Sequence, residues 1–131
     1  MKRLLELALI GLVSTPFPTL ASTPMNTDQH SSLTKIEFNL EQIDPNGLVG
    51  PADGKRSLRY EFCIPTGGHY FTQVREIDSS IELYPKSRGR IICGADQVLC
   101  IGETHKPNWR EVLMAIAQLD YVEKIIESHA E

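Results

Sequence analysis

Several features that would identify a function class are missing from this sequence. The 131 residues include 13 basic and 17 acidic side chains, so the net charge is −4 and the basic excess of nucleic-acid-binding proteins is absent. No nucleophile elbow, Walker loop, His-Glu-x-x-His motif or pair of catalytic carboxylates is present. Beyond the N-terminus, no apolar run reaches the roughly 20 residues of a transmembrane helix. We therefore expect no nucleic-acid partner, no cofactor and no mature transmembrane segment, and we favour a binding protein over an enzyme.

The first 21 residues have the three-part pattern of a secretory signal peptide. A basic start is followed by an apolar stretch over 4–13 and by small, turn-prone residues over 14–21. This pattern predicts cleavage after Ala21 and a periplasmic or secreted protein. Because Glu6 interrupts the apolar stretch, a cytoplasmic protein with an uncleaved leader is the alternative.

The rest of the chain divides into a linker and one domain. Residues 22–33 are polar and without periodicity, which predicts a flexible linker. Residues 34–131 are enough for a single domain with one core. Within it, apolar residues alternate over 36–43, which predicts a first strand.

From residue 57 onward, the hydrophobic pattern predicts a ferredoxin-like α+β domain. Strands are expected at 57–64, 81–84, 97–101 and 121–126, with helices that begin at 66–68 and at 108. This βαββαβ order is that of a ferredoxin-like antiparallel sheet with two helices on one face. The strand at 36–43 would be an addition to it. We expect the strand at 57–64 to pair with that at 97–101, with Ile64 opposite Gln97.

Three cysteines indicate a disulfide if the protein is exported. In an oxidising compartment two should pair and one should remain free. Residues 91–93 are expected to form a hairpin with 97–101, which would bring Cys93 and Cys100 within reach of each other. Pairing of Cys63 with Cys100 is the second possibility. In a cytoplasmic protein, all three would be small buried apolar residues.

The best-supported binding site in the sequence is one for an anion. In the predicted topology, the loop after the first sheet strand and the loop before the 97–101 strand lie at the same end. Amide groups at a helix start, faced by cations, suit a phosphate or a carboxylate. The predicted site consists of Thr66, Gly67, Gly68, Lys86, Arg88 and Arg90. The alternative is that the basic residues form an ordinary solvated loop.

These observations predict a small exported binding domain without catalytic residues. Its partner would be an unknown protein or a small anionic ligand. The alternative is a metal- or thiol-dependent enzyme or metal carrier that uses Cys63 and His69. No pair of cysteines or histidines has the spacing of a zinc motif, so we predict no metal site.

Overall fold

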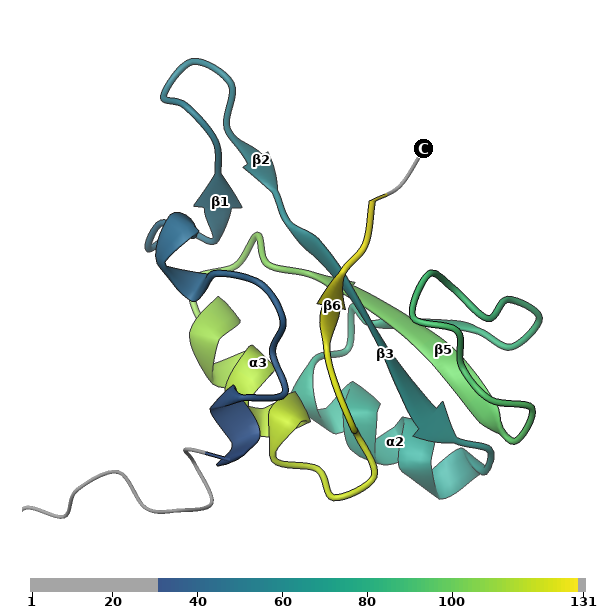
Figure 1. Ribbon diagram of the computed structural model, residues 1–131. Coiled ribbons are helices and arrows are strands. Elements are labelled where there is room, and N and C mark those ends of the chain that lie inside the picture. Colours follow the sequence, from purple (N-terminus) through teal and green to yellow (C-terminus); the bar gives the residue numbers. More distant parts are fainter. Residues whose placement is uncertain (1–30, 130–131) are drawn as a thin grey trace, which may run out of the picture.

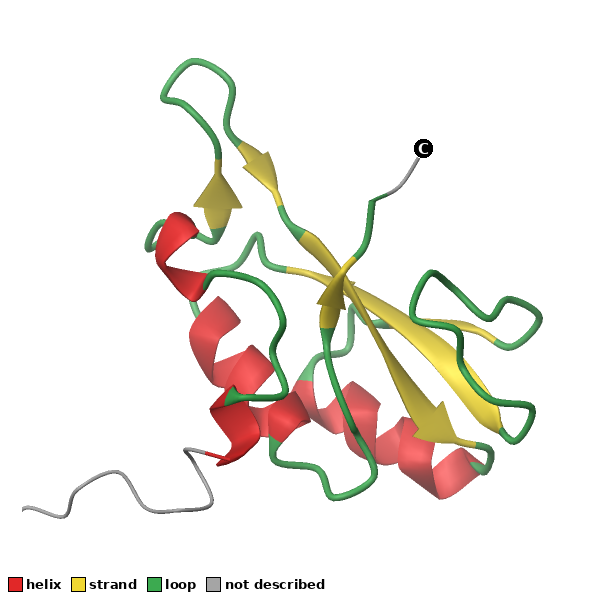
Figure 2. Cartoon of the chain, viewed as in Figure 1, coloured by secondary structure: helices red, strands yellow, loops and turns green. Residues whose placement is uncertain are grey.

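The part of the chain that the computed structural model describes, residues 31–129, contains two antiparallel sheets, the α-helices α2 and α3, and shorter helical segments (Figures 1 and 2). The larger sheet has the strand order β4-β5-β3-β6, and β1 pairs with β2 in the smaller sheet. The elements are η2 (Leu40–Gln42), β1 (Leu48–Val49), β2 (Arg56–Ser57), β3 (Arg59–Pro65), α2 (Gly68–Ile77), β4 (Glu82–Tyr84), β5 (Gln97–Glu103), α3 (Trp109–Ala117) and β6 (Ile126–Glu127). The predicted signal peptide and most of the predicted linker lie outside the described residues, whereas residues 31–33 are helical.

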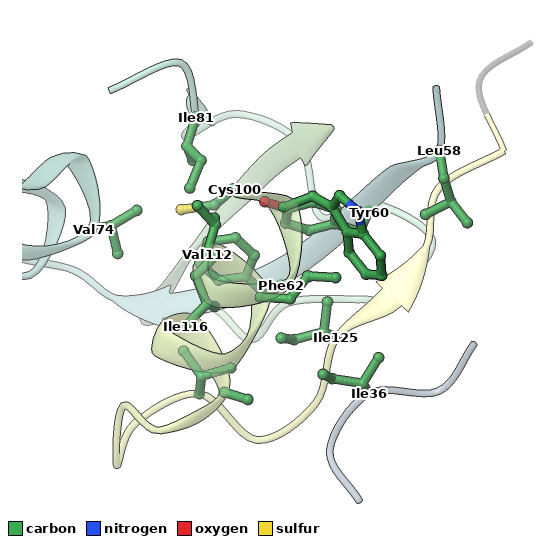
Figure 3. Close-up of a cluster of buried hydrophobic side chains, with 14 of the residues drawn as sticks. Ile36, Leu58, Tyr60, Phe62, Val74, Ile81, Cys100, Val112, Ile116 and Ile125 are labelled. Carbon is green, nitrogen blue, oxygen red and sulfur yellow. The ribbon is translucent and has the colours of Figure 1, made fainter. Parts of the chain in front are cut away.

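The hydrophobic core lies between the four-stranded sheet and the helices α2 and α3. We call this face of the sheet the inner face and the opposite one the outer face. Tyr60, Phe62 and Ile64 of β3 point inward and are at most 1% exposed. Val112 and Ile116 of α3 pack in the same cluster, as Figure 3 shows. Burial of such side chains is the main favourable term in folding, so the inner face stabilises the domain.

The predicted register between β3 and β5 is wrong by one residue. Ile64 lies opposite Val98, and Gln97 lies opposite Pro65. Val98, Leu99 and Cys100 are all buried, so β5 lacks the alternation that would reveal which side chains face inward. The one-residue difference in register changes the position of Cys100, which lies on the inner face with its partner Phe62.

The predicted N-terminal strand over 36–43 is not a strand in the structure. Ile36 makes an isolated parallel bridge with Ile125, and Leu40–Gln42 form the 3-10 helix η2. Phe38 and Leu40 still pack against the core. The alternating pattern therefore marked side chains that cover the core without continuous strand pairing.

Other elements also differ from the prediction, and β1 and β2 form a small sheet that was not expected. Residues 91 and 92 lie in a turn and Cys93 has no regular secondary structure, so 91–93 is not a hairpin arm, and the last strand is limited to Ile126–Glu127. The helices and β4 lie where the pattern placed them. None of the helices within residues 31–129 combines the length and apolar character needed to cross a membrane.

Candidate functional site

The connection between β4 and β5, residues 85–96, is tied to the outer face of the sheet by a disulfide. Cys63 of β3 is bonded to Cys93, with a Cα–Cα distance of 5.7 Å. The predicted disulfide between Cys93 and Cys100 is therefore wrong. Cys100 is the free cysteine, and it is buried on the other side of the sheet. The register explains why Cys63 does not pair with Cys100. Cys100 lies opposite Phe62, and Phe62 and Cys63 point to opposite faces because they are neighbours in β3.

A buried carboxylate supplies the second tie. Glu61 of β3 is only 3% exposed, and its Oε1 accepts a hydrogen bond from the Ile91 backbone N–H at 3.1 Å. Its Oε2 accepts a hydrogen bond from the Ser128 hydroxyl at 2.7 Å. Hydrogen bonds to a charged group are stronger than neutral ones, so Glu61 fixes both the loop and the C-terminal segment to β3.

Within the loop, residues 88–93 close into a compact turn, which we call the 88–93 turn. The Cys93 N–H donates to the Arg88 carbonyl, and the Arg88 Nε donates to the Cys93 carbonyl, both at 2.8 Å. Gly89 has a φ of 71°, and a Cβ at this position would lie 2.7 Å from the Glu61 Oε1. Only glycine fits here, so the turn can lie directly on the sheet.

Ile92 is the unusual residue of the turn. Its φ is 63°, in the left-handed region that β-branched residues rarely adopt. Its side chain is 68% exposed, and no other large hydrophobic residue within 31–129 is exposed. Backbone strain of this kind is concentrated at functional sites, and it makes the turn the candidate recognition surface.

A hollow of about 200 Å³ adjoins the turn. Its lining residues are Cys63, Ile91, Ile92, Gln97, Glu123 and Lys124. The hollow lies beside the disulfide and has one acidic and one basic residue on its border. It extends the candidate surface from the turn toward the segment before β6.

The structure does not connect the two halves of the predicted anion site. The Thr66 N–H and hydroxyl both donate to the Asp96 carbonyl, at 3.1 and 2.7 Å. Within residues 31–129, no hydrogen bond or ion pair joins Thr66, Gly67 or Gly68 to Lys86, Arg88 or Arg90. Arg88 is instead engaged with Cys93. Anion binding by these six residues stays a prediction.

Cys63 and His69, on which the thiol- or metal-dependent alternative rests, have different environments. The Cys63 sulfur is in the disulfide, and His69 is an exposed residue whose ring lies 3.9 Å from that of Tyr70. Burial raises the pKa of the free Cys100 thiol to about 12, so this thiol is protonated at neutral pH. No cluster of three or more His, Cys, Asp or Glu side chains that could hold a metal occurs among residues 31–129.

Comparisons of the chain with protein families, curated proteins and solved structures find no match. Functional assignment therefore depends on the geometry of the chain itself. Two residues that matter most in that geometry, Glu61 and Ile92, were not singled out from the sequence. A charged residue in the middle of a buried strand was the available signal for Glu61, whereas the φ of Ile92 has no sequence signal.

Proposed function

We propose that this protein is a small exported binding domain that acts without catalysis, and that the 88–93 turn is its recognition surface. The observation that carries the proposal is the combination of a firmly anchored turn with an exposed, strained Ile92. A surface that is already ordered loses little conformational entropy on binding. The anchoring by Cys63 and Glu61 therefore suits recognition of a partner.

The charge of the loop supports an anionic partner. Lys86 and Arg90 are exposed and make no ion pair or side-chain hydrogen bond with the rest of residues 31–129. A wider anion site that also includes Thr66, Gly67 and Gly68 has less support. Thr66 is occupied with the Asp96 backbone, and Asp96 itself adds a negative charge to this end of the sheet.

A thiol- or metal-dependent activity of Cys63 and His69 is the weaker second candidate. It would require reduction of the Cys63–Cys93 disulfide before Cys63 could act as a nucleophile or ligand. The same reduction would remove one of the two ties that hold the turn on the sheet, so the thiol-active state would present the turn less firmly.

The fold and the export of the protein are part of the proposal. The strand order β4-β5-β3-β6, with α2 and α3 between the strands in sequence, supports a ferredoxin-like arrangement. The intramolecular disulfide fits an oxidising compartment. Mass spectrometry of the natively produced protein should find Ser22 as the first residue, and an intact N-terminus would contradict export by cleavage.

A photo-crosslinking amino acid at position 92 tests the recognition surface. In the producing cells, we expect covalent adducts with a discrete partner, whether a macromolecule or a lipid, because position 92 would lie in the interface. The control places the same group at Gln42, an exposed residue of η2. Equal labelling from both positions would show that the turn has no special role.

A further inference from the structure

We propose that loop 85–96 binds anionic phospholipid surfaces through the 88–93 turn, with Ile92 in the apolar layer and Lys86 and Arg90 of the same loop against the lipid phosphates. This inference rests on the proposed function, because it names the partner of the same turn. It is carried by the presence of one exposed apolar side chain and two exposed cations, neither of which makes an ion pair, on a single loop that a disulfide holds in place.

The apolar part of the surface is small. Ile92 is the single large hydrophobic residue exposed within 31–129, at 68%. A typical protein–protein interface buries about 800 Å² on each partner and contains several anchoring side chains. A membrane interface accepts a single apolar side chain when cations beside it meet anionic headgroups. The size of the apolar surface therefore favours a lipid over a protein partner.

The charge distribution of the loop also favours a lipid partner. Loop 85–96 contains three basic residues and one acidic residue, whereas the whole chain has a net charge of −4. Glu123 and Lys124 beside the turn have opposite charges and add no net charge to it. An anionic surface would attract the loop and repel the acidic remainder, so electrostatics would orient the protein with the turn toward the lipid.

The anchoring explains how a strained residue can be presented to a membrane. The disulfide to Cys63 and the hydrogen bond to Glu61 hold the turn before any lipid is present. Asn or Gly would adopt the backbone conformation of Ile92 more easily. An isoleucine at this position is therefore unfavourable for folding alone, and insertion of its side chain into an apolar layer gives it a role.

Flotation with vesicles tests the proposal on the natively produced protein. We expect binding to vesicles of equal parts phosphatidylglycerol and phosphatidylcholine, and much weaker binding to phosphatidylcholine alone. Ile92→Asn should lower the partition coefficient about fivefold through loss of apolar burial. Lys86→Ala/Arg90→Ala should lower it about tenfold or more, because each cation near the surface contributes separately. The matched control Arg56→Ala/Arg75→Ala removes the same charge from exposed positions elsewhere and should have a much smaller effect.

Two readouts separate loss of binding from loss of folding. Because asparagine accepts a positive φ, Ile92→Asn should melt at the same or a higher temperature than the wild type while it binds less. In addition, the tryptophan emission of Ile92→Trp should shift to shorter wavelength with the anionic vesicles. The emission of Gln42→Trp should not shift.

Three results would overturn the inference: equal binding of wild type and Ile92→Asn, equal binding to neutral vesicles, or no binding at all. Attachment through the apolar stretch 4–13 would persist in every variant and would therefore count against it. Crosslinking from position 92 to a discrete protein, without vesicle binding, would overturn lipid recognition but leave the proposed recognition surface intact.

Discussion

The two faces of the four-stranded sheet are covered in different ways. On the inner face, Tyr60, Phe62 and Ile64 are covered by helices through apolar packing. On the outer face, Glu61 and Cys63 of the same strand hold a loop by a hydrogen bond and a disulfide. Apolar packing on the inner face is distributed over many contacts, whereas the loop on the outer face is held by a few directional bonds and covers one buried apolar side chain, Leu99. The inner face therefore determines whether the domain folds, and the outer face determines how one loop is presented.

The largest expected effect tests the inner face. Phe62→Ala should lower the free energy of unfolding by about 3–5 kcal/mol, because it removes a fully buried aromatic ring and leaves a cavity. The half-buried Ile101, which lies opposite Glu61 on the outer face, provides the comparison. Ile101→Ala should cost substantially less in denaturant titrations. Equal losses would contradict the division between the two faces.

The next effect concerns the disulfide. Cys63→Ala/Cys93→Ala should lower the free energy of unfolding by about 3 kcal/mol, because the bond closes a loop with a sequence separation of 30. Hydrogen exchange should accelerate much more at the Ile91 and Cys93 amides than at Phe62. If the Phe62 amide lost as much protection, the disulfide would be holding the core and not the loop.

A smaller effect is expected from the buried carboxylate. Glu61→Ala should cost about 2 kcal/mol, since the Ile91 amide and the Ser128 hydroxyl both lose a charged acceptor. Glu61→Gln keeps a carbonyl acceptor and should cost less. Hydrogen exchange at Ile91 is the direct measurement. Unchanged exchange in Glu61→Ala would show that the disulfide alone fixes the turn.

The smallest effect depends on pH and lies where α2 ends. Burial of Asp78 opposes its ionisation, but hydrogen bonds from Lys106 and Ser80 prevail and lower the pKa of its carboxyl below 3.8. A lowered pKa stabilises the fold above that value, and the contribution is lost as the pH falls through the folded-state pKa. Asp78→Asn should therefore cost about 1 kcal/mol or less at neutral pH and nothing in strong acid.

The matched control for this comparison is Asp53→Asn, which changes an exposed carboxylate. It should have no measurable effect at either pH. If Asp78→Asn cost as much in strong acid as at neutral pH, the loss would come from packing and not from the charge of Asp78.

Local patterns were sufficient to predict the helices and the strands β3, β4 and β5. The helices over 68–77 and 109–117 follow from apolar residues at helical spacing, and β3 follows from its alternation. The pattern at 36–43 was misleading, because Phe38 and Leu40 pack against the core from a segment that is mostly not strand. A period of two records which side chains are buried, and it does not record whether the backbone pairs with a neighbour.

The register, the disulfide and the exposed turn were decided by the tertiary structure. Because Val98, Leu99 and Cys100 are all buried, local hydrophobicity could not distinguish two registers that differ by one residue. That single residue moves Cys100 to the inner face and leaves Cys63 to pair with Cys93. The disulfide in turn places the 88–93 turn over Glu61, where Gly89 fits and Ile92 is exposed. Contacts between residues far apart in sequence are not encoded in local periodicity, so the candidate site became visible only in the folded chain.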